Sequence, residues 1–427
     1  MSDATRRPAV LKFGGTSVGK PDNLRRALRI VWEGRKHEPV VVVVSALSGV
    51  TDQLVEALAA AAQGQETAPA FLDRLFVRHR DLLTAVGGGG AESATLEAEL
   101  ERLRRLLRAV ATLHEVTPRA QAAVMSAGER LSAPIFAAGL RALGQDARAV
   151  DAAGLIVTDA SFAEATVDLP ATAAAVTHLL VPVGDPLPVV TGFIGATRDG
   201  ITTLLGRGGS DYSAAILGHA LGADRVEIWT DVDGVMTADP RHVPEARTVS
   251  ELSYAEASEL ARAGAKVLHP RTLAPLVSHG IPVLVRNTKA PAAPATRVVP
   301  LVAAGGAKAI AIAASVCPHQ SRRRLALVGE GLGADRHLKS RVVLALERSG
   351  IPLRALVEED GGRTLAVEVE DSHAASALRA LHAGVIESEF DRPIPVWETA
   401  APCPSSPRSR SPAASSSLCS SDGPSSE

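Results

Sequence analysis

Aromatic residues are scarce in this chain, and neither sign of charge prevails. Aromatic side chains make up 3% of its 427 residues, and 45 basic side chains stand against 47 acidic ones, which leaves a formal net charge of -2. A protein that coats nucleic acid needs a basic surface and uses aromatic rings to stack on bases. We therefore expect no nucleic-acid partner.

Cysteine and long apolar runs are also scarce. The three cysteines, Cys317, Cys403 and Cys419, are too few for a disulfide framework, and none forms a metal-type pair. The first ten residues hold no apolar stretch of the signal-peptide type. The valine run at 40–44 is far shorter than the ~20 residues of a membrane-spanning helix. We expect a cytoplasmic protein with reduced thiols, no membrane partner and no metal site made of protein ligands alone.

What the chain does contain is an alternation of short β-branched runs with helical segments. At ~150 residues per domain, its length predicts two or three domains. Strand patterns at 9–13 and 40–44 flank a helix that Pro21 opens. The pattern is helical over 51–116, and the alternation resumes from 188 to 300. This order is typical of an α/β fold.

A second, smaller domain is predicted after a composition break at 303–306. From Arg324 the order is strand, helix, strand, strand, helix and a last strand, with a tight turn at 360–362 that makes the central strands antiparallel. This βαββαβ order is ferredoxin-like. After Ala400 the chain is rich in serine and proline, which predicts disorder. The predicted domains are 1–302, 303–399 and 400–427.

The first segment that predicts chemistry is Lys12-Phe13-Gly14-Gly15-Thr16-Ser17, where a strand runs into two glycines and then a helix. Glycines let backbone N–H groups approach phosphate oxygens closely, and a helix N-terminus favours an anion. The alternative is that the glycines only make a tight turn. Residues 14–20 also match most of a phosphate-loop pattern, but its final hydroxyl position is Pro21. We therefore expect Lys12, whose ammonium group can reach the glycine loop from the strand end, to matter for phosphate binding rather than Lys20.

A second glycine segment spans 205–213, Leu-Gly-Arg-Gly-Gly-Ser-Asp-Tyr-Ser. Arg207 offers a planar fork that suits a carboxylate, and Asp211 is placed to face a cation. We expect Ser210 or Asp211 to cap the helix that follows. A capped helix start with a surface arginine is the alternative interpretation.

Three further segments place polar residues near expected strand or helix ends. The run at 229–235 and the following Asp-Pro-Arg put Asp231 beyond a strand, where open α/β sheets bind ligands, although a plain turn explains it equally well.

Lys266 offers a second positive charge to a nucleotide. His269, before Pro270, is interpreted as a structural hydrogen-bonding residue. Glu129 opens a helix and either accepts a ligand ammonium group or favours the helix dipole.

One glycine motif is discounted. Residues 329–334, Gly-Glu-Gly-Leu-Gly-Ala, follow a strand and match a relaxed dinucleotide fingerprint. A dinucleotide-binding unit needs a crossover helix between parallel strands. The next two strands are joined by the tight turn at 360–362 and have no such helix between them, so we do not expect a dinucleotide site here.

Taken together, these segments resemble the aspartate kinases of the amino acid kinase family. KFGGTSV, VVSALSGVTD, SAGERLS, LGRGGSDYSA, WTDVDGV, DPR and GAKVLHPRT occur in the family's order over residues 9 to 300. The chain looks most like the kinase half of the bifunctional aspartate kinase–homoserine dehydrogenases. Residues 324–390 resemble one ACT regulatory domain. The resemblance implies a three-layer αβα open sheet followed by a ferredoxin-like ACT domain.

The resemblance also implies a reaction, in which ATP, with Mg²⁺, transfers its γ-phosphoryl group to the side chain of L-aspartate. It assigns catalytic roles to Lys12 and Asp211. The implied substrate-binding residues are Thr51, Glu129, Arg207, Gly208, Gly209 and Ser210. The implied nucleotide-binding residues are Lys12, Gly14, Gly15, Thr16, Ser17, Thr230, Asp231, Met236, Arg241, Lys266 and Val267. The further implications are a homo-oligomer, a dimer or tetramer, and lysine or threonine as the effector at the ACT domain.

The chain departs from the family in places. Family members often have Tyr where Met236 stands and Phe where Ala263 stands, and many carry two ACT domains where residues 309–320 leave a remnant of the second. Two other functions compete with the first: a kinase for another acidic amino acid such as glutamate, and an amino-acid or nucleotide sensor without turnover.

Overall fold

The structure is a computed structural model that describes residues 6–65, 68–265, 268–303, 307–312, 321–359 and 361–387. The described residues all fall within one unit of the chain, residues 1–389. The predicted tail at 400–427 lies outside them. Among the described helices, none is long and apolar enough to cross a membrane.

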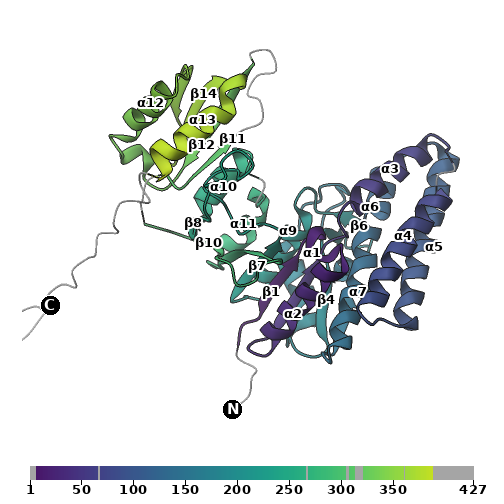
Figure 1. Cartoon of the computed structure of the whole chain (residues 1–427). Helices are drawn as coiled ribbons and strands as arrows, with labels where there is room; N and C mark the ends of the chain where they lie inside the picture. The colour runs from purple at the N-terminus through teal and green to yellow at the C-terminus, as the bar shows by residue number, and fades with distance from the viewer. Residues whose placement is uncertain are drawn as a thin grey trace, which may run out of the picture. The chain divides into compact units, whose positions relative to one another are not determined.

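An eight-stranded sheet forms the centre of the larger part (Figure 1). Its strand order is β3-β4-β2-β1-β7-β9-β10-β8, and all neighbours are parallel except β9 and β10. The strands are β1 (Ala9–Phe13), β2 (Val40–Val44), β3 (Ala147–Val150), β4 (Leu187–Thr191), β7 (Arg225–Thr230), β8 (Glu251–Ser253), β9 (Val283–Asn287) and β10 (Thr296–Val299).

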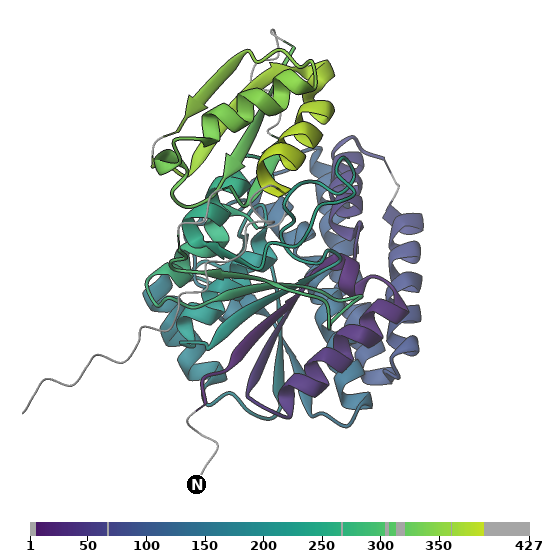
Figure 2. The same ribbon diagram turned by 60° about the vertical axis from the view of Figure 1, so that its left-hand side comes forward.

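Helices cover both faces of this sheet (Figure 2). Leu11 and Phe13 of β1 pack into one apolar core and Val10 into another, because successive side chains of a strand point to opposite faces. The first core is covered by α1 (Gly15–Val18), α2 (Pro21–Arg35), α3 (Val50–Ala62), α4 (Ala68–Ala85), α5 (Gly90–Leu113), α6 (Pro118–Met125) and α7 (Ala127–Ala142). The second is covered by α8 (Leu169–Leu180), α9 (Gly209–Ala220), α10 (Tyr254–Arg262) and α11 (Pro270–Val277). The expected three-layer αβα fold is confirmed.

The C-terminal part contains a separate antiparallel sheet in the order β11-β12-β14-β13. Its elements are β11 (Ala309–Ile312), β12 (Arg322–Val328), α12 (Leu338–Arg348), β13 (Ala355–Glu358), β14 (Thr364–Glu370) and α13 (Ala374–Leu381). The predicted antiparallel pairing of the central strands, β13 and β14, is confirmed.

One expectation for this sheet needs correction. In the part of the chain that the structure describes, the fourth strand is β11, which precedes β12, and the residues directly after α13 form no strand; the rest of the predicted last strand lies outside the described residues. After α13 the described chain continues as a helical turn at His382–Glu387. Residues 309–312, interpreted from the sequence as part of a remnant of another domain, thus complete this sheet. Their apolar pattern suits this position, since Ala309, Ile310 and Ala311 are all buried.

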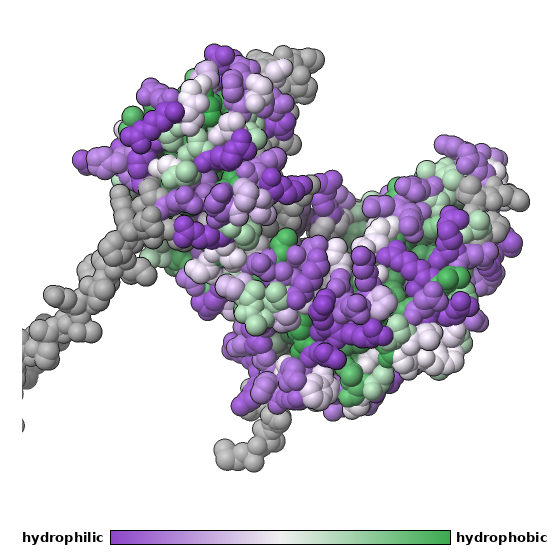
Figure 3. Space-filling model, in the orientation of Figure 1, coloured by the Kyte–Doolittle hydropathy of each residue, from purple (hydrophilic) through white to green (hydrophobic). Residues whose placement is uncertain are grey.

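The molecular face in Figure 3 is mostly hydrophilic, with hydrophobic residues scattered in small groups. By contrast, all five residues of β1 and of β2 are buried. A short hairpin of β5 (Ile194–Ala196) and β6 (Thr202–Leu204) follows β4 and leads into α9.

Candidate active site

The carboxyl ends of the parallel strands meet at one edge of the large sheet, and the chemistry-bearing residues lie there. The chain leaves β1 toward β2 on one side, whereas β7 is its neighbour on the other side. Ligands bind outside the carboxyl ends of strands where the strand order reverses in this way. At that point the N–H of Gly14 donates a 3.1 Å hydrogen bond to the carbonyl of Trp229, which ties the glycine loop to the end of β7.

Lys12 and Asp211 form an ion pair at this edge. Lys12 Nζ lies 2.5 Å from Asp211 Oδ1, and their side chains are 11% and 16% exposed. Asp211 stands in the first turn of α9, whose N-cap is Gly208, with φ 69° and no side-chain cap. The expectation that Ser210 or Asp211 caps this helix is therefore wrong. The helix begins at Gly209, two residues earlier than a Ser210 cap requires, and the carboxylate of Asp211 is engaged by Lys12.

The two glycines after β1 make room for different neighbours. A Cβ on Gly14 would lie 3.4 Å from Lys12 Nζ, so this glycine keeps the approach to the ammonium group open. A Cβ on Gly15 would lie 2.7 Å from the carbonyl oxygen of Ala46. The carbonyl of Gly15 accepts a 3.2 Å hydrogen bond from the N–H of Ser48. The glycine loop therefore packs directly on the segment that follows β2.

Thr16 and Ser17 differ in what their side chains face. Thr16 is exposed. Ser17 is buried, and its hydroxyl lies 3.3 Å from the carbonyl of Trp229 and 2.7 Å from Thr288 Oγ1. The N–H of Ser17 donates to the carbonyl of Gly14 at 2.9 Å. The polar groups of Ser17 thus join α1 to the ends of β7 and β9.

Glu129 is buried in the first turn of α7, 3% exposed. Its Oε1 accepts a 3.1 Å hydrogen bond from the N–H of Ala46, while its Oε2 is buried without a hydrogen-bond partner among the described residues. Burial raises the pKa of Glu129 to about 8, although this hydrogen bond and the charges of Lys12 and Arg130 oppose the shift. An unpartnered carboxylate oxygen in this position is suited to a cationic ligand group.

The remaining predicted substrate residues lie at or just before the starts of α3 and α9. Thr51 is half-buried in the first turn of α3. Arg207 is exposed, and the structure gives it no ion pair or hydrogen bond to the residues it describes. A Cβ on Gly209 would lie 2.5 Å from the ring of Phe193, and one on Gly192 would lie 2.6 Å from Cβ of Ser210. These glycines let the start of α9 pack closely on the end of β4.

Two groups of residues at this edge are absent from the sequence predictions. Gly192 and Phe193 follow β4, and the N–H of Phe193 donates to Ser213 Oγ at 2.9 Å. Asn287 is the last residue of β9 and Thr288 follows it, and Asn287 Nδ2 donates to Asp233 Oδ1 at 2.6 Å. The signal that finds them is the one used for Asp231, polar residues or glycine directly after a buried strand.

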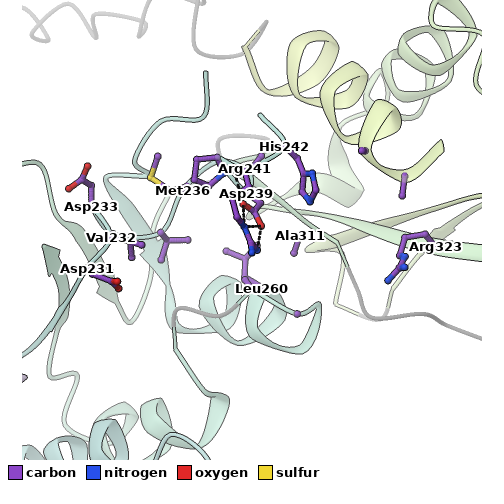
Figure 4. Close-up of a pocket in the computed structure, with 18 of the residues that line it drawn as sticks. Asp231, Val232, Asp233, Met236, Asp239, Arg241, His242, Leu260, Ala311 and Arg323 are labelled. Carbon is purple, nitrogen blue, oxygen red and sulfur yellow. Dashed lines mark hydrogen bonds and ion pairs between the residues drawn. The ribbon is translucent and has the colours of Figure 1, made fainter. Parts of the chain in front are cut away.

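A cavity of about 980 Å³ lies beside the end of β7 (Figure 4). Asp231, Met236 and Arg241, all predicted to bind nucleotide, line it, and Thr230 directly precedes this segment. Gly264 and Ala265 also line it, but the next two residues, Lys266 and Val267, lie outside the described residues. Its volume is at the upper end of the range for small-molecule sites.

Arg241 is exposed at the wall of this cavity and held by Asp239. Its Nη2 lies 2.5 Å from Asp239 Oδ2, and its Nε lies 3.0 Å from Oδ1. This side-chain hydrogen bonding lowers the pKa of Asp239, against the opposing effect of its partial burial. His269, interpreted as structural, is the N-cap of α11, where its Nδ1 accepts a 3.3 Å hydrogen bond from the N–H of Arg271.

The family follows from comparison with known proteins. Residues 7–287, well over half of the chain, match the model of the amino acid kinase family. The chain belongs to the amino acid kinase family. Within the family it is similar to aspartokinases, as the resemblance in the sequence predicts.

Two curated relatives and one solved structure show this similarity. The chain is 35% identical over 294 residues to the bifunctional aspartokinase/homoserine dehydrogenase of Haemophilus influenzae, and 39% identical over 294 residues to lysine-sensitive aspartokinase 3 of Escherichia coli. These matches cover 67% and 68% of this chain but 36% and 63% of the relatives, so the chain spans less than two thirds of either. The crystal structure of E. coli aspartokinase III with aspartate and ADP has a TM-score of 0.78 at 28% identity, covering 88% of this chain and 99% of that chain.

The described residues also fit a magnesium ion that arrives with a nucleotide. They contain no group of three or more His, Cys, Asp or Glu side chains placed to hold a metal ion by themselves. Mg²⁺ usually keeps several waters and is bound through one or two carboxylates plus substrate phosphates. Asp211, partly exposed beside Lys12 and the glycine loop, is such a carboxylate.

Proposed function

We propose that this amino acid kinase is an aspartate kinase, which transfers the γ-phosphoryl group of ATP to the side-chain carboxylate of L-aspartate and yields ADP and 4-phospho-L-aspartate. The observation that carries the proposal is the pairing of Lys12 with Asp211 beside Gly14, together with Glu129, which feels the charge of Lys12 and has a buried Oε2 without a partner among the described residues. The aspartokinases among its relatives, and the aspartate and ADP bound to one of them, support it.

The chemistry needs alignment and charge neutralisation rather than a general base. The attacking carboxylate has an ordinary pKa of about 3.9 and is already ionised at neutral pH. One of its oxygens bonds to the γ-phosphorus while the bond from that phosphorus to the β,γ-bridging oxygen breaks, and ADP leaves without net proton transfer. Two anions must therefore be held in line, and negative charge on the transferring group must be balanced.

The substrate half of the site is built for a small amino acid with two carboxylates. Glu129 accepts the substrate ammonium with its free Oε2. Arg207, exposed and without a protein partner in the described part of the chain, binds a substrate carboxylate through its planar fork. Thr51 and the backbone of Gly208, Gly209 and Ser210 line the same pocket.

The nucleotide half lies on the other side of the glycine loop. Lys12 stabilises the transferring phosphoryl group, and the backbone N–H groups around Gly14, Gly15 and Thr16 approach the phosphates. Asp211 keeps Lys12 in position and is the carboxylate that would hold Mg²⁺; when bound, this ion neutralises phosphate charge. Thr230, Asp231, Met236 and Arg241 contact the nucleoside, together with Lys266 and Val267 as predicted from the sequence. Ser17 positions the loop.

We also propose how the chain is divided and which effector regulates it. The boundaries at 302 and 399 divide a catalytic part from an ACT-like part, and lysine is the first effector to test because one relative is named lysine-sensitive. Threonine is the second effector to test. A homo-oligomer and a cytoplasmic location stay predictions from the sequence.

An assay with a panel of amino acids tests the function. The purified protein is given Mg²⁺-ATP, hydroxylamine and one amino acid at a time, and both ADP release and the acyl hydroxamate are measured. We expect both signals with L-aspartate and little of either with L-glutamate or L-asparagine. Comparable turnover of glutamate overturns the substrate assignment, and ATP binding without turnover of any amino acid supports a sensor instead.

A further inference from the structure

The cavity beside β7 extends beyond the elements of the large sheet. The segment from Asp231 to His242 forms one wall, whereas the opposite wall comes from the C-terminal part. The C-terminal residues that line it are Ala311 on β11, Arg323 on β12, Asp371 in the turn after β14, and Ala374 and Ala375 at the start of α13. Of these, Arg323 and Asp371 alone carry charge.

This second wall is fixed to the first by hydrogen bonds at Thr237. The carbonyl of Thr237 accepts a 2.8 Å hydrogen bond from the N–H of Ile310 in β11, and its hydroxyl lies 2.8 Å from Nε2 of His382. Thr237 stands between Met236 and Ala238, which both line the cavity. The C-terminal wall is therefore attached at the same segment that carries the predicted nucleotide residues.

Arg323 is held with its guanidinium plane in a defined orientation. Its Nε and Nη2 lie 2.7 and 2.6 Å from Oδ1 of Asp371, and its side chain is 29% exposed. Its Nη1 has no partner among the residues that the structure describes. A guanidinium fixed in this way loses little conformational entropy when a ligand stacks on it or accepts its remaining hydrogen bonds.

The cavity is otherwise poor in planar groups. Among its described lining residues there is no Phe, Tyr or Trp, and the planar cations or rings are His242, Arg241 and Arg323. In Figure 4, Arg323 lies on the opposite side of Ala311 from Arg241. A purine base offers a flat π-face and ring-nitrogen acceptors, and guanidinium groups serve both.

We propose that Arg323 is a nucleotide-binding residue that contacts the base end of ATP, so that the nucleotide pocket is completed by the C-terminal part of the chain. The inference rests on the proposed function for the orientation of the ligand. The phosphates lie at the glycine loop beside β1, and the cavity leads from Asp231, at the end of the neighbouring strand β7, to Arg323. The base therefore points toward Arg323, and the phosphates point away from it.

Equilibrium binding to the full chain tests this, with Mg²⁺-ATP and tripolyphosphate as the two probes. Arg323→Ala should weaken ATP binding by about tenfold, in line with the loss of one charge-assisted contact, and leave the affinity for tripolyphosphate unchanged. Arg324→Ala is the matched control. Arg324 is the next residue of the same strand, is paired with Glu359 and is not among the residues that line the cavity. It should bind both probes as the wild type does.

The outcomes separate this inference from the proposed function. Equal ATP affinity in Arg323→Ala and wild type overturns the inference, as does an equal loss in both arginine variants, which would indicate a general structural effect. A loss of tripolyphosphate affinity in Arg323→Ala overturns the contact with the base. If the wild type binds ATP but phosphorylates no amino acid, the kinase assignment fails while the Arg323 result still stands. If the wild type binds no nucleotide, both fail.

Discussion

Lys12 Nζ lies 2.5 Å from Oδ1 of Asp211, a contact between the first strand of the sheet and the first turn of α9. The two side chains are only slightly exposed, so each would carry an uncompensated charge in a poorly solvated position without the other. The pair therefore keeps an ammonium group at the carboxyl edge of β1, beside the glycine loop, with its position defined before any phosphate arrives.

Replacing Lys12 by methionine should reduce kcat by about 10²–10³-fold, because the charge that stabilises the transferring phosphoryl group is lost while a side chain of similar length remains. Steady-state kinetics with saturating aspartate and ATP measures this. Lys20→Met is the matched control, since Lys20 is exposed and precedes α2. Wild-type kcat in the Lys12 variant would remove this lysine from the mechanism.

Arg207→Ala should raise KM for aspartate about 10- to 100-fold with a smaller effect on kcat, the range expected for a lost hydrogen-bonded charge of about 1.5–3 kcal/mol. Arg207→Lys should fall between, because lysine keeps the charge but lacks the planar fork. Arg207 is exposed, so neither variant should alter thermal stability. Arg198→Ala, at an exposed surface pair with Asp168, serves as the control. A change in KM for ATP alone would move Arg207 to the nucleotide half.

Gly15→Ala should destabilise the protein and weaken ATP binding together. The added Cβ would lie 2.7 Å from the backbone carbonyl of Ala46, and backbone atoms cannot move away as a flexible side chain would. A forced shift of this kind costs about 1–3 kcal/mol. Gly34→Ala, within α2, is the matched control, because its nearest neighbour would be 4.0 Å away and alanine favours a helix. Thermal melts without ADP measure the loss of stability, and the added stabilisation by ADP measures nucleotide binding. A Gly15→Ala variant as stable as Gly34→Ala contradicts the packing argument.

Local patterns in the sequence predict the first two strands of the large sheet and the loops that follow its strands. The runs at 9–13 and 40–44 are β1 and β2 with the predicted bounds, because five valines in β2, and four apolar residues with Lys12 near the end of β1, fit strands buried on both faces. The glycine loop, the position of Asp231 beyond β7 and the start of a helix near Ser210 follow from local rules of the same kind.

Local rules were not sufficient where two distant segments had to meet. The pairing of β11 with β12 depends on a contact between neighbouring strands that no pattern within either one encodes. In the same way, the sequence predicts a nucleotide contact for Ser17 from its place after the two glycines, but it does not predict that the Ser17 hydroxyl lies 2.7 Å from Thr288 Oγ1, just beyond the end of β9. The N-cap of α9 is Gly208, whose backbone is in the left-handed region, and not Ser210 or Asp211. The carboxylate of Asp211 instead forms an ion pair with Lys12.

Aspartate binding should tighten as the pH rises from 6 to 8, because Glu129 must lose a proton to accept the substrate ammonium. Burial raises the pKa of Glu129 to about 8 in the free protein, so its carboxyl is mostly protonated at pH 6, and binding of the ammonium then releases that proton. Linkage of one proton predicts a Kd that falls by up to about tenfold per pH unit below this pKa and levels off above it. Calorimetry in two buffers of different ionisation enthalpy measures both the Kd and the proton released.

Glu129→Gln keeps an oxygen for the N–H of Ala46 but cannot ionise, so its binding should be weak and independent of pH over this range. A wild-type Kd that is constant from pH 6 to 8, with no proton released, would show that Glu129 does not meet the ammonium group.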